Sequence, residues 1–162
     1  MGAKMMGRRA ALLMMAGALA GCAAAGRAPE PVLARSQPPS GGSGIHALVD
    51  QQAAALGIPR ELMHRVVRSE SSYNPAARNG PYLGLMQIHP QTARTMGFRG
   101  RPEELLDPVT NLTYGGRYLR GAWIVANGDM DRAIGWYRRG YYYEARNRGL
   151  LVETGLASRE RR

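Results

Sequence analysis

Glu70 is the side chain in this sequence whose setting best suits chemistry. Pro59 can begin a helix and Asn74-Pro75 can end it, so a helix of about four turns is expected between them. One face of that helix follows the i, i+3, i+4, i+7 pattern and consists of Met63, Val66, Val67 and Glu70. Burial disfavours the charged form of a carboxyl group, and a general acid must hold a proton. We therefore interpret Glu70 as a candidate general acid; the alternative is a structural acid that bends out to solvent or caps a neighbouring backbone group.

Other catalytic or metal-binding arrangements are not supported by the residue types. The histidines His46, His64 and His89 lack the spacing of metal ligands, and a single cysteine excludes an internal disulfide framework or a cysteine-rich metal site. No Ser/His/Asp nucleophile set can be recognised. The remaining acids fall at predicted caps, in a first helical turn or in polar segments, so none has a setting like that of Glu70. We expect neither a metal nor a cofactor.

Five blocks of residues, in order along the chain, carry a resemblance to a known family. They are Glu70-Ser71, Asn74-Pro75, Gly84-Leu85-Met86-Gln87-Ile88, Asp107-Pro108 with Asn111, and Ala133 with Tyr137 and Gly140. In this order and at this spacing they resemble the catalytic domain of the soluble-lytic-transglycosylase (SLT, goose-lysozyme-like) family, over about residues 45–149. The resemblance implies an all-α, lysozyme-like fold, that is, a single compact helical domain with a substrate cleft.

The same resemblance implies an activity on peptidoglycan glycan strands. The family cleaves the β-1,4 bond between N-acetylmuramic acid and N-acetylglucosamine and leaves a 1,6-anhydromuramoyl end, with one acid acting first as acid and then as base. Glu70 matches that acid, and Ser71, Met86, Gln87 and Tyr137 match substrate-binding positions. Met86 and Gln87 are expected to line the sugar site, and the Tyr137 hydroxyl to point toward the acid. A lysozyme-type hydrolase and a non-catalytic peptidoglycan-binding lipoprotein remain as alternatives.

Three departures from the family pattern support the non-catalytic alternative. Where the family usually has a serine and then a Gly-Ala pair, this chain has Arg78 and Pro81-Tyr82. The common Tyr-Asn pair of the family is Tyr137-Arg138 here. The lip of the cleft is therefore open to question, and Arg138 is given no role in the site.

The N-terminal residues have the pattern of a bacterial lipoprotein signal. Residues 1–21 combine basic residues with a short apolar run and contain no acid, which is typical of a secretory signal peptide. Leu19-Ala20-Gly21-Cys22 resembles a lipobox, which implies that Cys22 becomes the lipidated first residue. Residues 22–44 then hold this cysteine and a flexible tether rich in Pro, Gly, Ser and Ala.

Charge and targeting together indicate the compartment and the partners. The formal net charge of the chain is +10, which favours a polyanionic partner. A protein with a lipoprotein signal rarely meets nucleic acid, and no basic-aromatic recognition motif is present. Ala23, rather than an aspartate, follows the cysteine, which favours the periplasmic side of the outer membrane. We expect a monomer that binds peptidoglycan and is attached to the membrane through Cys22.

Caps, breakers and apolar periodicity predict the elements that position these residues. The expected elements are a support helix over 45–56, a loop over 76–83 forming one lip of the cleft, short helices over 90–96 and 102–106, a long core helix from Asp107 to about Ala126, and a helix over 130–137. Asn111 and Trp123 are expected to be structural, and at most two of Tyr141-Tyr142-Tyr143 can form a sugar-stacking platform. Residues 150–162 are expected to be a charged tail.

Overall fold

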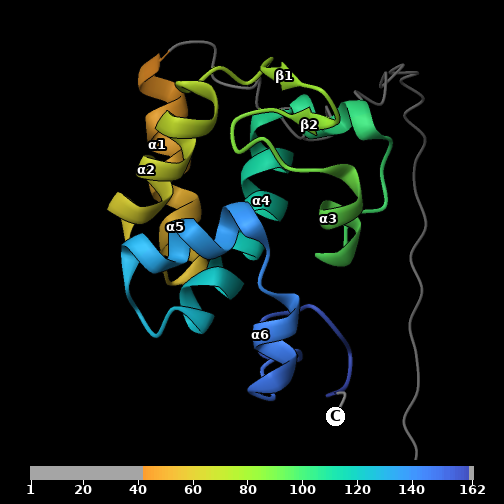
Figure 1. Ribbon diagram of the computed structural model, residues 1–162. Coiled ribbons are helices and arrows are strands. Elements are labelled where there is room, and N and C mark those ends of the chain that lie inside the picture. Colours follow the sequence, from red (N-terminus) through yellow and green to blue (C-terminus); the bar gives the residue numbers. More distant parts are fainter. Residues whose placement is uncertain (1–41, 161–162) are drawn as a thin grey trace, which may run out of the picture. The chain divides into compact units, whose positions relative to one another are not determined.

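The computed structural model describes residues 42–160, which form a mostly helical domain (Figure 1). The elements are α1 (Gly42–Leu56), α2 (Arg60–Ser71), β1 (Arg78–Asn79), β2 (Tyr82–Leu83), α3 (Pro90–Thr95), the 3₁₀ helix η1 (Pro102–Leu106), α4 (Pro108–Val125), α5 (Met130–Arg139) and α6 (Tyr142–Asn147). This order confirms the expected helical fold class. The predicted signal peptide over 1–21 and the lipidation site Cys22 lie outside the described residues. The predicted tether does so up to residue 41, and α1 begins within its last residues.

Helix α4 is the central element of the domain, as expected for the predicted long core helix. It packs against α1 and α5 and also contacts α3 and η1. A Cβ atom on Gly116 would lie 2.5 Å from Cδ1 of Leu56, and one on Gly115 would lie 2.8 Å from the sulfur of Met86. Glycine at these positions therefore lets α1 and the loop after β2 approach the α4 backbone closely.

Helix α2 ends earlier than the Asn74-Pro75 pair predicts. Its last residue is Ser71, and Ser72 and Tyr73 adopt left-handed backbone angles, with φ of 50° and 64°. The left-handed Ser72 is the C-cap, and its N–H donates to the carbonyl of Arg68. The proline thus follows a turn that has already ended the helix. Glu70 consequently lies in the last turn of α2, next to the chain reversal.

The predicted loop over 76–83 contains a short β-hairpin whose two strands have two residues each. Arg78 pairs with Leu83 and Asn79 pairs with Tyr82 in antiparallel register. Gly80 and Pro81 form the turn, where Gly80 has a φ of 56° that glycine adopts without strain. The hairpin makes the lip of the cleft a hydrogen-bonded unit.

The expectation of a charged tail from residue 150 is wrong for the described part of that segment. Leu151 is fully buried and Thr154 is nearly so, and Leu151 belongs to the main hydrophobic core. The carboxylate of Glu160 accepts hydrogen bonds from the N–H groups of Leu151 and Val152, at 3.1 and 2.7 Å. The segment lacks helical periodicity because it folds as a series of turns, yet it still places an apolar side chain in the core.

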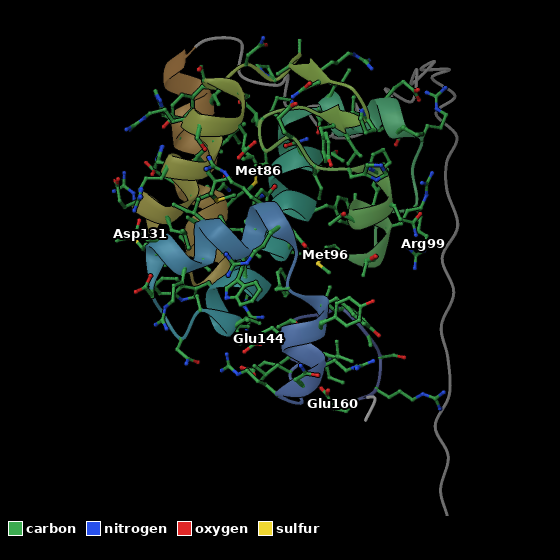
Figure 2. The ribbon with its side chains drawn as sticks, in the orientation of Figure 1. Met86, Met96, Arg99, Asp131, Glu144 and Glu160 are labelled. Carbon is green, nitrogen blue, oxygen red and sulfur yellow. The ribbon has the colours of Figure 1, made fainter. Side chains whose placement is uncertain are left out.

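Figure 2 shows which side chains lie inside this domain and which lie on its surface. Met86 lies in the interior among the helices, whereas Arg99, Asp131 and Glu160 lie at the periphery. Tyr118 contacts two other tyrosines inside the domain: its ring centroid lies 5.5 Å from that of Tyr137 and 4.7 Å from that of Tyr141. None of the helices within residues 42–160 is both long and apolar enough to span a membrane.

Candidate active site

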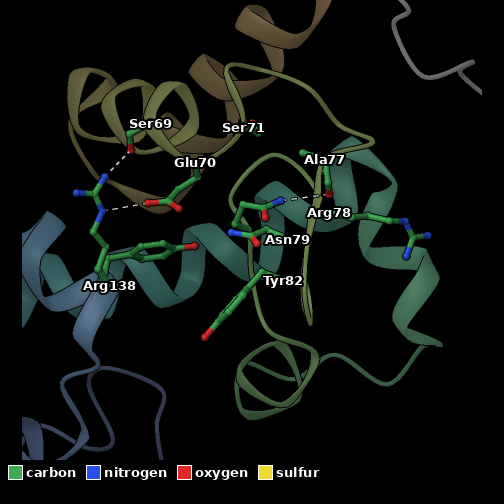
Figure 3. A pocket seen from close by; sticks show the side chains of 10 residues that line it. Ser69, Glu70, Ser71, Ala77, Arg78, Asn79, Tyr82 and Arg138 are labelled. Carbon is green, nitrogen blue, oxygen red and sulfur yellow. Dashed lines mark hydrogen bonds and ion pairs between the residues drawn. The ribbon is translucent and has the colours of Figure 1, made fainter.

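An open cleft of about 550 Å³ lies beside Glu70 (Figure 3). The end of α2, the β1–β2 hairpin, the loop after β2 and the end of α5 supply its walls. It is lined by Ser69, Glu70, Ser71, Ala77, Arg78, Asn79, Tyr82, Gln87, Tyr137 and Arg138. Figure 3 shows Glu70 between Arg138 on one side and Asn79 and Tyr82 on the other. The expected cleft is therefore present at the expected acid.

Glu70 occupies the setting that the helical pattern predicted. The three apolar members of its stripe, Met63, Val66 and Val67, are buried in the core. The Glu70 side chain is 22% exposed, because it comes from the last turn of α2, where the core gives way to the cleft. It is thus neither a solvated surface acid nor a fully buried one.

Arg138 binds Glu70 directly, and sequence reasoning missed this contact. Its Nε atom donates to Oε1 of Glu70 at 3.1 Å, and its Nη2 atom donates to the hydroxyl of Ser69 at 2.9 Å. Helix α5 brings the arginine next to an acid 68 positions earlier in the chain. The available signal was that Arg138 directly follows Tyr137, at the position where the family has a polar asparagine.

The loop after β2 is held by the buried side chain of Asn111. Its Oδ1 atom accepts from the N–H of Met86 at 2.8 Å, and its Nδ2 atom donates to the carbonyls of Leu83 and Leu105 at 2.8 and 2.6 Å. Gly84 has a φ of 73°, and a Cβ atom there would collide with the Asn111 amide. The structural role expected for Asn111 is confirmed, and it consists of fixing the segment that leads to Gln87.

The side chain of Met86 does not line the cleft, which corrects its assignment as a sugar-contacting residue. It is fully buried and packs against Gly115 of α4. Leu85 and Met86 both lie in the core, and Gln87 is the residue of this loop that lines the cleft. Met86 contributes to the site through its backbone, because its carbonyl accepts a hydrogen bond from Tyr137.

Gln87 and Ser71, both expected to bind substrate, line the cleft. The Gln87 amide nitrogen donates to the carbonyls of Gly84 and Ala77 at 2.9 and 3.2 Å. Its amide oxygen has no hydrogen-bond partner among residues 44–160. The Ser71 hydroxyl donates to the carbonyl of Leu85 at 2.7 Å, which ties the end of α2 to the loop after β2.

Tyr137 lines the floor of the cleft and is otherwise buried. Its hydroxyl donates to the Met86 carbonyl at 2.8 Å rather than to Glu70. Burial raises the pKa of the Tyr137 phenol well above its usual value, and the nearby charge of Glu70 raises it further. The phenol is therefore a neutral hydrogen-bond donor at physiological pH, and it connects α5 to the loop that carries Gln87.

The cleft continues into a second hollow of about 220 Å³. The two share Tyr82, Gln87, Tyr137 and Arg138, and the second hollow also includes His89 and Arg139. A further hollow shares Arg139 and Gly140 with the second one and is also lined by Trp136, Tyr142 and Tyr143. Tyr142 is 38% exposed and Tyr143 is 72% exposed. Tyr141 is buried, so it cannot belong to a stacking platform, and a sugar-binding role for Tyr142 and Tyr143 stays a prediction.

Glu70 is the only carboxylate that lines the cleft within the described part of the chain. In the same residues, no three His, Cys, Asp or Glu side chains gather closely enough to hold a metal ion. Proton transfer at this site therefore has one candidate group, which must serve as both acid and base if two proton transfers occur.

The fold and the site define a known class of domain. Residues 47–149, more than half of the chain, match the family described as "Transglycosylase SLT domain", so the chain belongs to this family. This confirms the family that the five sequence blocks predicted.

Curated relatives of the chain are lytic murein transglycosylases. The endo-type membrane-bound lytic murein transglycosylase A of Klebsiella pneumoniae subsp. pneumoniae is 32% identical over 124 residues, which are 68% of this chain and 59% of that protein. The membrane-bound lytic murein transglycosylase C of Mannheimia succiniciproducens is 36% identical over 89 residues, which are 50% of this chain and 24% of that protein. The chain thus spans less than two thirds of the length of these relatives. No solved structure matches it significantly.

Proposed function

We propose that this protein is a peptidoglycan lytic transglycosylase, with Glu70 as its catalytic acid and base. It would cleave the β-1,4 bond between N-acetylmuramic acid and N-acetylglucosamine and form a 1,6-anhydromuramoyl product. The family supports the reaction class, and the relatives carry this activity in their names. The observation that carries the proposal is the single half-buried carboxylate of Glu70 in an open cleft of this fold.

In the first step Glu70 donates its proton to the glycosidic oxygen. The C1–O bond of the muramoyl sugar breaks, the N-acetylglucosamine unit leaves with a free hydroxyl, and Glu70 becomes a carboxylate. The N-acetyl carbonyl oxygen of the same muramoyl sugar stabilises the positive charge that develops at C1. The substrate thereby supplies the group that a second protein carboxylate supplies in most glycosidases.

In the second step the Glu70 carboxylate takes the proton of the C6 hydroxyl of the muramoyl sugar. The C6 oxygen attacks C1, closes the 1,6-anhydro ring and restores the neutral N-acetyl group. Glu70 ends the cycle protonated, and no water is consumed. One acid is sufficient for this sequence, which fits a cleft that has one carboxylate among the described residues.

Positioning must supply the rest of the rate enhancement, because one acid-base group contributes about 10²–10⁴-fold. Asn111 and Tyr137 fix the loop that carries Gln87, and Ser71 joins that loop to the helix that carries Glu70. Gln87 offers a free amide oxygen to a sugar hydroxyl. We assign substrate contact to Gln87 and positioning roles to Ser71 and Tyr137.

Replacing Glu70 tests the proposal. Glu70→Gln removes the transferable proton but keeps the size of the side chain, so release of soluble muropeptides from purified sacculi should fall by about 10²-fold or more. Glu61→Gln is the matched control, because Glu61 is exposed in the first turn of the same helix. Circular dichroism should show the same helical content in both variants. Near wild-type activity in Glu70→Gln would remove this residue from its role.

The chemistry of the product separates the two enzymatic possibilities. Mass spectrometry of the digest should show muramoyl ends that lack one water, because the C6 hydroxyl is the nucleophile. Reducing muramic ends would instead identify a lysozyme-type hydrolase. If wild-type protein binds sacculi and clears none of them, it is a non-catalytic wall-binding protein.

We also propose that the domain is anchored through a lipid on Cys22, at the periplasmic side of the outer membrane. The support is the lipobox-like pattern and the membrane-bound state named for the relatives. Fractionation of cells that express wild-type protein or Cys22→Ser checks it. The variant should leave the membrane fraction, and a variant that stays there would refute this anchor.

A further inference from the structure

The guanidinium of Arg138 presents a carboxylate-binding edge to the cleft. Its Nε and Nη2 groups lie on the same edge of the planar guanidinium, and this edge can bind a carboxylate through two parallel hydrogen bonds. In this protein the edge is divided between two partners, Oε1 of Glu70 at 3.1 Å and the hydroxyl of Ser69 at 2.9 Å. Only one of its two hydrogen bonds therefore reaches a carboxylate.

Another arginine of the same domain uses the same edge to bind both oxygens of one carboxylate. Arg60 donates through Nε and Nη2 to both carboxylate oxygens of Asp50, each at 2.7 Å. Both of these hydrogen bonds are shorter than those of Arg138. The Arg138 edge thus has the donors for a whole carboxylate, but Glu70 fills only half of it.

The surroundings of Arg138 leave room for a ligand. Its side chain is 54% exposed and lines both the Glu70 cleft and the hollow that continues it. The Nη1 group has no hydrogen-bond partner among residues 44–160. Arg78, on the hairpin lip of the same cleft, is exposed and has no acidic partner in that part of the chain. Two cationic side chains therefore border a cleft that contains one acid.

The contact with Arg138 also occupies one of the two oxygens of the Glu70 carboxyl group. While Arg138 donates to Oε1, this oxygen faces the guanidinium, and only Oε2 can face a glycosidic oxygen. A sugar that enters the cleft excludes water from both partners, so a guanidinium that simply lost Glu70 would be left without its charge partner. A carboxylate on the ligand would replace Glu70 and leave both groups satisfied.

We propose that Arg138 and Ser69 form a binding subsite for a carboxylate of the substrate, which Glu70 occupies only while the cleft is empty. This inference rests on the proposed function, in which the substrate is a peptidoglycan strand. Carboxylates near a muramoyl sugar have two sources: the acidic residues of its stem peptide, and the lactyl group of a sugar that has lost its peptide. Binding of either releases Oε1 of Glu70, so the subsite couples recognition of an anionic strand to release of the acid.

Cleavage rates on three matched substrates test the subsite. The substrates are glycan strands with free-acid stem peptides, strands whose stem carboxylates are amidated, and strands freed of their stems. Wild-type protein should cleave free-acid strands with a kcat/KM about 10-fold or more above that for amidated strands, as expected for a charged hydrogen-bonded pair. Stem-free strands that behave like free-acid strands show that the lactyl carboxylate also fills the subsite; stem-free strands that behave like amidated ones restrict its ligand to the stem.

Arg138→Ala should abolish this preference. Free-acid strands lose the charged hydrogen bonds of the subsite, so the ratio of the two kcat/KM values should fall to about one. Arg132→Ala is the matched control, because Arg132 lies on the same helix, is exposed and does not line the cleft. It should keep the wild-type ratio. An equal loss of activity on all three substrates in Arg138→Ala would show that Arg138 only supports Glu70, and it would overturn the subsite.

A binding measurement decides the question without catalysis. Calorimetric titration of Glu70→Gln with a free-acid muropeptide and with its amidated form should show about 10-fold tighter binding of the free acid. The double variant Glu70→Gln/Arg138→Ala should bind both forms equally. Equal affinities in Glu70→Gln itself would refute the subsite. If wild-type protein cleaves none of the strands, the proposed function fails, and this titration still tests the carboxylate site by itself.

Discussion

At the scale of the residue, the direction of each side chain decides which of the matched positions can bind substrate. Met86 and Gln87 are neighbours, yet one is fully buried and the other lines the cleft. Their spacing in the sequence carries no information on which faces inward. The direction follows from Asn111 and Tyr137, which hold the backbone of Met86 on both sides, one by its N–H and the other by its carbonyl.

Asn111→Ala should destabilise the domain strongly. The substitution leaves the N–H of Met86 and the carbonyl of Leu105 without partners in the interior, while the carbonyl of Leu83 keeps the N–H of Ile88. Unsatisfied buried groups cost about 1–3 kcal/mol each, although relaxation and water recover part of this, so a loss of about 2–4 kcal/mol is expected. Urea denaturation followed by circular dichroism measures it.

Asn147→Ala is the matched control for that measurement. Asn147 is exposed at the end of α6, and its substitution should change the free energy of unfolding by less than about 0.5 kcal/mol. Equal unfolding midpoints for Asn111→Ala and the wild type would contradict the role given to Asn111.

At the scale of the element, the helix caps depend on local contacts, whereas the position of the final segment, residues 150–160, depends on distant ones. Asp107 accepts from the N–H of Thr110, and Asp129 accepts from the N–H of Arg132, both at 2.8 Å, so each is the N-cap of the helix that follows it. The final segment has no such local signal. Its position depends on Leu151, which packs in the core, and on Glu160, which holds the first turn of the segment.

Leu151→Ala should therefore destabilise the protein as a core substitution does. Leu151 is fully buried, and removing its side chain leaves a cavity that costs about 2–5 kcal/mol. Its neighbour Val152 is 47% exposed, so Val152→Ala should have an effect below about 0.5 kcal/mol. Thermal unfolding of the two variants in parallel compares them. Similar melting temperatures would mean that this segment is a tail after all.

At the scale of the whole molecule, three tyrosines join α4, α5 and the start of α6. The hydroxyl of Tyr141 donates to the carbonyl of Tyr118, and that of Tyr137 donates to Met86. Burial raises the pKa of the phenol in Tyr118, Tyr137 and Tyr141. The native state therefore keeps protons on these groups at a pH where the unfolded chain loses them.

This difference predicts a loss of stability at alkaline pH. Because the folded pKa values lie above the unfolded value of about 10, the stabilisation is fully present below pH 10 and decreases as the pH rises beyond it. The urea midpoint should fall steadily from pH 9.5 to 11.5. Near pH 10.5 an unfolded tyrosine with a pKa of about 10 is roughly three quarters ionised. Absorbance of phenolate should therefore show about six of the eight tyrosines ionised in urea and clearly fewer in the native state. Equal titration of the folded and the unfolded protein would contradict the prediction.

The sequence by itself determined the helices up to α5, the caps Asp107 and Asp129, the family and the position of the candidate acid. These features depend on near neighbours: a cap needs a side chain three positions away, and the stripe that ends in Glu70 needs one turn of helix periodicity. Only the tertiary structure decided that Met86 turns inward, that Leu151 enters the core and that Arg138 binds Glu70. Each of these contacts joins segments far apart in the chain, so it depends on how the helices pack, which no local pattern encodes.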